Sequence, residues 1–299
     1  MNVTVNKLSE AGAAEILGLD CSQPLDAETL SALKRTMLEY PVIAIRAQTL
    51  TPKQQATFSR QLGPLESQDR TTYTHPDDPD ILILSNEIRP DGTAVGIVDA
   101  GDFWHSDSSH HEEPCNRTVL YAVRNPSRGG ATEFCNMYQV YDALPPDLKQ
   151  GVEGRYGIHH ISKIKNPRVT ISAARTDAKD YYKQHEKVTK EVLQPIVRTH
   201  PETGRQALYI SPRFTIGIAD MPDSEAQPLL DKLFAVMMDE RFHYRHHWQD
   251  QDLVIWDNRC LNHQACGGYS TIHIRTNRPP TRVLQRVTSS DRRPTPRRR

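Results

Sequence analysis

Two imidazoles and one carboxylate constrain the fold of this chain most, because a metal site built from them must bring remote segments together. His105 and Asp107 stand two residues apart in the segment 104–107. The aromatic and small polar residues around them are typical of a strand end, where residues two apart point the same way. His263 follows the apolar run 253–256 and a polar turn. Two histidines and one carboxylate that leave coordination positions open are typical of non-haem Fe(II).

A second His-x-Asp triplet, His75-Pro76-Asp77, lies in a different setting. Residues 74–80 read Thr-His-Pro-Asp-Asp-Pro-Asp, and proline and aspartate at this density favour turns. We therefore predict a solvated turn here and keep His105, Asp107 and His263 as the metal ligands.

Four segments, in chain order, resemble the taurine/2,4-dichlorophenoxyacetate dioxygenase family. They are Trp104-His105-Ser106-Asp107-Ser108-Ser109, Gly129-Gly130-Ala131-Thr132-Glu133-Phe134-Cys135-Asn136-Met137, Tyr141-Asp142-Ala143-Leu144-Pro145, and Trp256-Asp257-Asn258-Arg259-Cys260 with His263. The likeness covers nearly the whole chain and is greater to the phenoxyacetate branch. It implies a mainly β fold with flanking helices, a double-stranded β-helix or cupin-like jelly roll, with iron held at one end by His105, Asp107 and His263.

The resemblance also implies an Fe(II)- and 2-oxoglutarate-dependent dioxygenase, in which 2-oxoglutarate supplies two of the electrons that O2 activation needs. Thr132 matches the family's hydroxyl at the 2-oxoglutarate site. Arg282 matches the arginine that binds 2-oxoglutarate, and Arg286 the arginine that reaches the substrate's anionic group. A guanidinium suits both tasks because it offers paired donors and stays charged. Residues four apart on a strand lie on one face.

The sequence departs from the family pattern in two places. His263 and Arg282 are farther apart than usual, so Arg275 is an alternative anchor for 2-oxoglutarate. We prefer Arg282, because Arg-x-x-x-Arg-x-Thr keeps both arginines. Thr71 and Thr93 stand where the phenoxyacetate branch has lysines, so we do not expect herbicide cleavage.

A small organic anion is the expected substrate, such as a carboxylate, a sulfonate, a sulfate ester or an anion that resembles an aryloxyalkanoate. Family topology adds Tyr73, Asn86 and Arg213 to the substrate pocket. Hydroxylation beside a leaving group would also split the product. The alternatives are a jelly roll that binds a metal or an anion without turnover, and a zinc-dependent hydrolase.

Composition limits the partners. The chain carries 37 basic and 37 acidic side chains, so no general attraction to nucleic acid or membrane is expected. The longest apolar runs are too short to span a bilayer. Five scattered cysteines favour reduced thiols and a cytoplasmic location. We expect one domain over residues 1–288, a disordered basic tail over 289–299, and a homo-oligomer, either a dimer or a tetramer.

Local signals predict three helices and eight strands. Capping residues and apolar spacing predict helices over 26–40, 52–63 and 223–240. Strands are expected over 41–46, 81–85, 117–124, 191–199, 206–211, 242–248, 252–257 and 282–288. The remaining clustered histidines are expected to line the barrel or face solvent rather than bind a second metal; they are His110, His111, His243, His246 and His247.

Overall fold

The computed structural model describes residues 3–66, 73–87, 89–97, 101–126, 128–161, 190–268 and 283–289, the last of these by backbone alone. Arg282, the alternative anchor Arg275 and residues 290–299 lie outside the described residues. The single domain over 1–288 and the tail over 289–299 stay predictions.

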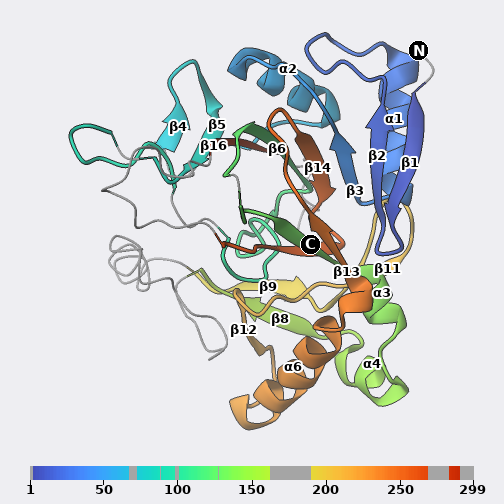
Figure 1. The fold of residues 1–299 in the computed structure, drawn as a ribbon. Coiled ribbons are helices and arrows are strands. Elements are labelled where there is room, and N and C mark those ends of the chain that lie inside the picture. Colours follow the sequence, from blue (N-terminus) through green and yellow to red (C-terminus); the bar gives the residue numbers. More distant parts are fainter. Residues whose placement is uncertain are drawn as a thin grey trace, which may run out of the picture.

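Strands dominate the structure, and helices flank them (Figure 1). The strands are β1 (Thr4–Ser9), β2 (Ala13–Leu17), β3 (Val42–Ile45), β4 (Thr74–His75), β5 (Asp78–Ser85), β6 (Arg117–Arg124), β7 (Thr132–Asn136), β8 (Tyr156–His159), β9 (Val192–Pro195), β10 (Val197–Thr199), β11 (Gln206–Leu208), β12 (Thr215–Ile218), β13 (His243–His246), β14 (Leu253–Asp257), β15 (Leu261–Ala265) and β16 (Val283–Ser289). The helices are α1 (Ala27–Glu39), α2 (Pro52–Leu62), α3 (Met137–Asp142), α4 (Pro146–Val152), α6 (Asp223–Met237) and the 3-10 helix η2 (Glu240–Phe242).

A large sheet forms one layer of the molecule. Its strand order is β1-β2-β3-β14-β6-β16-β5-β4, and only β2 and β3 pair in parallel. Smaller sheets with the orders β13-β7-β15, β12-β8-β9 and β10-β11 form the other layer. Most pairs in the large sheet join strands that are far apart in the sequence. The sheet therefore forms only when distant segments of the chain come together.

The centre of the large sheet is buried on both faces. On β14, Val254 and Trp256 face the core between the two layers, whereas Leu253 and Ile255 face the core under α1 and α2. Side chains alternate between the faces of a strand. A continuous apolar strand is therefore needed where both faces are covered.

The first two helices begin where the capping residues predicted. Asp26 accepts a hydrogen bond from the Thr29 backbone N–H at 2.7 Å before α1. Thr51 and Gln54 form a capping box at the start of α2. Figure 1 shows α1 and α2 beside the N-terminal strands, with α4 and α6 at the opposite end near β8 and β12. The predicted helices are confirmed, each between one and three residues shorter than expected.

Two further predictions concern a strand and a turn. The strand expected over 191–199 is divided into β9 and β10 at the buried Ile196. His75-Pro76-Asp77 does form a turn, in which the Asp77 backbone N–H donates to His75 Nδ1 at 3.1 Å between β4 and β5. Among the described residues, no helix combines the length and apolar character needed to cross a membrane.

Candidate metal centre

His105, Asp107 and His263 converge at one end of the fold. One donor atom from each residue can be chosen so that all three lie within 4.8 Å of one another. His105 Nε2 lies 3.4 Å from Asp107 Oδ1, and His263 Nε2 lies 3.7 Å from Asp107 Oδ2. All three side chains are buried. Among the described residues, this is the one cluster whose histidine, cysteine and carboxylate donors fit a metal ion.

The backbone sets the distance between the two imidazoles. His105 and His263 form an isolated antiparallel bridge, with backbone N–O distances of 3.0 and 2.8 Å. Their ring centroids lie 4.2 Å apart. His105 Nδ1 lies 2.8 Å from the Phe103 carbonyl, which can only accept a hydrogen bond. The proton therefore sits on Nδ1, and Nε2 keeps the lone pair that a metal needs.

A glycine makes room for the His105 ring. Gly101 has φ of +75°, and a Cβ at this position would lie 2.8 Å from His105 Cε1. A side chain here would be strained by the left-handed backbone conformation and would also clash with the ring.

Two residues that the sequence analysis did not assign hold the segment with Asp107. Thr118 Oγ1 in β6 donates to Asp107 Oδ2 at 2.6 Å. Asn258, in the turn between β14 and β15, accepts a hydrogen bond from Ser106 Oγ through its backbone carbonyl at 2.7 Å. Asn258 belongs to a motif already quoted for the family resemblance. Thr118 gave no comparable signal, because nothing in the sequence distinguishes it from other threonines in strands.

Thr132 opens β7 on the side of the metal cluster. In the pairing of β7 with β15, Phe134 lies opposite His263, and Thr132 lies two residues from Phe134 on the same face. The Thr132 side chain is buried. Its hydroxyl accepts a hydrogen bond from Trp248 Nε1 at 3.0 Å. Trp248 was not among the predicted site residues.

The arginines expected on the last strand are described only in part. The backbone of β16 pairs Arg286 with Leu120 of β6 and with Leu82 of β5. Arg282 precedes β16 in the sequence and lies outside the described residues. Tyr73 precedes β4 and Asn86 follows β5, and both are partly exposed at the ends of this hairpin. Their roles stay predictions.

Arg213 lies beside the aromatic wall of the site. Its side chain is fully buried. The guanidinium carbon lies 5.1 Å from the Phe103 ring centroid and 5.0 Å from that of Phe214. These two rings lie 5.3 and 6.0 Å from the His105 ring. The structure thus places a buried cation one aromatic ring away from the metal cluster.

Three other histidines, each buried or half-buried, have partners in the fold. Burial lowers the pKa of His159 to about 3, and this ring lies 3.2 Å from both Ser109 Oγ and Thr215 Oγ1. His246 Nε2 lies 3.1 Å from Asp252 Oδ2. His243 Nε2 lies 2.8 Å from the Met237 carbonyl. These contacts account for buried or half-buried imidazoles without a second metal.

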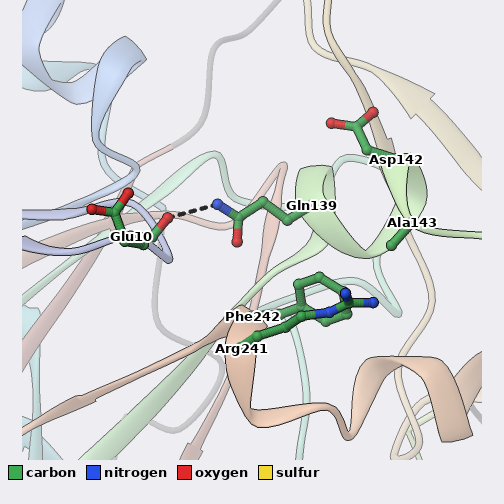
Figure 2. A pocket seen from close by; sticks show the side chains of 6 residues that line it. All are labelled: Glu10, Gln139, Asp142, Ala143, Arg241 and Phe242. Atoms are coloured by element: carbon green, nitrogen blue, oxygen red, sulfur yellow. Dashed lines mark hydrogen bonds between the residues drawn. The ribbon is translucent and has the colours of Figure 1, made fainter.

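A surface hollow elsewhere on the molecule is separate from the metal cluster. Figure 2 shows this hollow, about 410 Å³ in volume, where Gln139 Nε2 donates to the Glu10 carbonyl at 2.6 Å. Its lining residues are Glu10, Gln139, Asp142, Ala143, Arg241 and Phe242. None of them is a predicted site residue.

Facing sheets that bring two imidazoles and one carboxylate together define a mononuclear metal-binding jelly roll. Among such proteins, the chain belongs to the taurine catabolism dioxygenase TauD, TfdA family, whose model matches residues 4–288. The family and the jelly-roll fold predicted from the sequence are confirmed.

Characterised relatives match most of the chain. The alpha-ketoglutarate-dependent 2,4-dichlorophenoxyacetate dioxygenase of Cupriavidus pinatubonensis is 33% identical over 274 residues, which are 89% of this chain and 92% of the relative. The (S)-phenoxypropionate/alpha-ketoglutarate-dioxygenase of Sphingobium herbicidovorans is 34% identical over 84% of this chain and 85% of the relative. The solved structure of AAD-2 in complex with Mn(II) and N-oxalylglycine superposes with a TM-score of 0.77 at 27% identity and covers 99% of this chain and 100% of that chain.

Proposed function

We propose that this protein is an Fe(II)- and 2-oxoglutarate-dependent dioxygenase that hydroxylates a small organic anion. The observation that carries the proposal is the convergence of His105, Asp107 and His263 on one buried point, in a chain of the TauD, TfdA family. The two characterised relatives act with alpha-ketoglutarate on aryloxyalkanoates. Neither metal or anion binding without turnover nor zinc-dependent hydrolysis has comparable support.

The donor set fits Fe(II). We assign Nε2 of His105, the Asp107 carboxylate and His263 as the ligands, because two neutral imidazoles and one carboxylate suit this ion and leave positions open for other molecules. Iron held by these residues would supply O2 activation, with 2-oxoglutarate converted to succinate and CO2; one oxygen atom would end in succinate and the other in a new C–OH group of the substrate.

Thr132 and an arginine of the last strand would hold 2-oxoglutarate. Because Trp248 donates to the Thr132 hydroxyl, the hydroxyl's own proton can point to a carboxylate. We assign the paired guanidinium to Arg282 rather than Arg275, because the pattern Arg-x-x-x-Arg-x-Thr preserves both arginines of the family. No described residue contradicts this choice.

Arg213 and Arg286 would bind the anionic group of the substrate. The support for Arg213 is its buried guanidinium between Phe103 and Phe214, a setting that favours an anion held against aromatic surface. Tyr73 and Asn86 would complete the pocket. Thr93 is exposed and bonded to Asp91 at 2.7 Å, so this position offers no cation to an aryloxyalkanoate.

An anaerobic titration tests the proposal without knowledge of the substrate. The apoprotein receives Fe(II) and then 2-oxoglutarate, while the visible charge-transfer absorption of the iron–ketoacid pair is followed. We expect a band that is lost in His105→Ala and His263→Ala and kept in His75→Ala, whose histidine belongs to the other His-x-Asp triplet. A folded, iron-loaded protein without the band would contradict the proposal.

A screen for succinate release then addresses the substrate class. Carboxylates, sulfonates, sulfate esters and aryloxyalkanoates are the anions to compare. Arg213→Gln is expected to keep the absorption band and to lose turnover of the accepted anion. Equal turnover by this variant would remove Arg213 from the substrate site.

Oligomeric state and location complete the proposal. We infer a homo-oligomer, either a dimer or a tetramer, which sedimentation velocity would test. We also infer a cytoplasmic location, because all five cysteines are free thiols and thiols persist in a reducing compartment. Localisation of a tagged chain by fractionation tests this.

A further inference from the structure

A chain of buried hydrogen bonds runs from Trp256 to Asp107. Trp256 Nε1 donates to Asn258 Oδ1 at 3.0 Å, Asn258 Nδ2 donates to Thr118 Oγ1 at 2.9 Å, and Thr118 Oγ1 donates to Asp107 Oδ2 at 2.6 Å. All four residues are at least nine-tenths buried. They come from β6, β14, the turn after β14 and the segment that carries His105.

Chemistry fixes the direction of every bond in this chain. The Trp256 indole can only donate, so the Asn258 oxygen must face it and the Asn258 amide nitrogen must face Thr118. A hydroxyl has one proton. Since Thr118 accepts from Asn258, its proton points to Asp107. Buried bonds to a charged acceptor are stronger than neutral ones.

Asn258 also ties the backbone of the metal segment to this chain. Its backbone carbonyl accepts from Ser106 Oγ at 2.7 Å, and its Oδ1 lies 3.4 Å from the Asp107 backbone nitrogen. The turn after β14 thus holds both the backbone and, through Thr118, the carboxylate of Asp107.

We propose that Thr118, oriented by Asn258 and Trp256, is a positioning residue that holds the Asp107 carboxylate in its metal-binding orientation. The inference rests on the proposed function, because it takes Asp107 as a ligand. Without the Thr118 hydroxyl, the carboxylate can rotate about its bond to Cβ, and the divalent ion loses a fixed oxygen. Partners of this kind change metal affinity by about 10- to 100-fold.

The test is a titration of the apoprotein with Mn(II), in which the EPR signal of the free ion gives the dissociation constant. Thr118→Val, which is close to isosteric, is expected to raise that constant by about 10- to 100-fold. Thr118→Ser keeps the hydroxyl and is expected to stay close to wild type. Asp107→Ala is the reference for loss of the ligand itself.

Thermal unfolding of each apoprotein separates positioning from folding. A wild-type unfolding temperature with weakened Mn(II) binding in Thr118→Val supports positioning. If Thr118→Val does not fold, Thr118→Ala removes the same hydroxyl without placing a methyl group against Asp107. Unchanged Mn(II) affinity in the folded variant, while Asp107→Ala binds poorly, would overturn the role of Thr118 alone. Wild-type affinity in Asp107→Ala would overturn the proposed metal site itself.

Discussion

The metal cluster depends on single residues that shape the space around two of its ligands, His105 and Asp107. Gly101 has no side chain next to His105, the Phe103 carbonyl fixes the proton on His105, and Thr118 holds Asp107. None of the three is a predicted ligand, yet each sets the orientation of one. Substitution of residues that are not ligands should therefore change metal or co-substrate binding.

Gly101→Ala is expected to disturb His105 directly. The new Cβ would lie 2.8 Å from the ring, at a backbone φ of +75°. Gly92→Ala is a matched control, because Gly92 has φ of +85° but a Cβ there would meet no heavy atom within 4 Å. Both variants should lose about 1 kcal/mol from backbone strain. Only Gly101→Ala should weaken Mn(II) binding, as measured by EPR titration; equal affinities would mean that the ring accommodates the methyl group.

Trp248→Phe is expected to weaken 2-oxoglutarate binding without affecting the metal. The indole N–H that fixes the Thr132 hydroxyl is lost. One neutral hydrogen bond contributes about 0.5–1.5 kcal/mol, which corresponds to roughly a two- to tenfold rise in the 2-oxoglutarate dissociation constant. Anaerobic titration of the charge-transfer band measures it, with Mn(II) affinity as the control. A change confined to Mn(II) affinity would contradict this role of Trp248.

At the scale of secondary-structure elements, the turn between β14 and β15 is held by buried charge. Arg259 donates to Asp257 through Nε at 2.8 Å and to Glu202 through Nη1 at 2.7 Å. Glu202 lies in the turn between β10 and β11 and also accepts from Arg117 at 2.8 Å. Burial alone would raise the pKa of Asp257, but Arg259 outweighs burial and holds this pKa well below its usual range.

Arg259→Met should therefore destabilise the fold strongly. The substitution leaves the buried Asp257 carboxylate without its cation, which costs about 3–5 kcal/mol in such pairs. Arg245→Met is the comparison, because Arg245 is half exposed and pairs with Glu133 at 2.9 Å, a contact worth about 0–1 kcal/mol. Urea unfolding of both variants measures the difference. Similar losses would show that burial adds nothing to the Arg259 pair.

Elements with strong local signals were predictable, whereas a strand without such a signal was not. Asp26 and Thr51 marked α1 and α2, since caps are encoded within a few residues. Strand β7 was not predicted. Its sequence, Thr-Glu-Phe-Cys-Asn, lacks clear alternation, and β13 and β15 stabilise it from far along the chain.

The same contrast holds in the site. His105, Asp107 and His263 could be named from residue types, spacing and the family resemblance. The roles of Thr118 and Trp248 depend on contacts across 11 and 116 residues of sequence. The local sequence of neither segment predicts these contacts, because threonine hydroxyls and tryptophan indoles form hydrogen bonds at many structural positions in proteins.

At the scale of the whole molecule, acid should lower the free energy of unfolding in two successive pH windows. His159 is buried as the neutral imidazole, with a pKa lowered to about 3, whereas the unfolded chain has a histidine pKa of about 6.5. Between these values the unfolded state binds a proton that the folded state does not. The free energy of unfolding therefore falls as pH decreases through this window. Asp257 and Glu202, whose pKa values are lowered in the fold, add to the loss only below about pH 4.

His159→Gln isolates the contribution of the first pH window. Glutamine can still meet Ser109 and Thr215 but does not ionise. The free energy of unfolding of the variant should change less with pH than that of the wild type between about pH 6.5 and 4. One proton corresponds to about 1.36 kcal/mol per pH unit, so the difference should reach several kcal/mol. Urea unfolding across this range measures both slopes. Parallel slopes in the two proteins would contradict the assignment to His159.

The backbone bridge between His105 and His263 has a consequence for how such a protein can change over time. Because the backbones of His105 and His263 are paired by two hydrogen bonds, that pairing sets the spacing of the two imidazoles. The segment between β11 and β12 that carries Arg213 takes no part in it. Connecting segments tolerate replacement better than the framework they join. On the proposed role of Arg213, exchanges around it would change which anion the site accepts while the spacing of the metal ligands is kept.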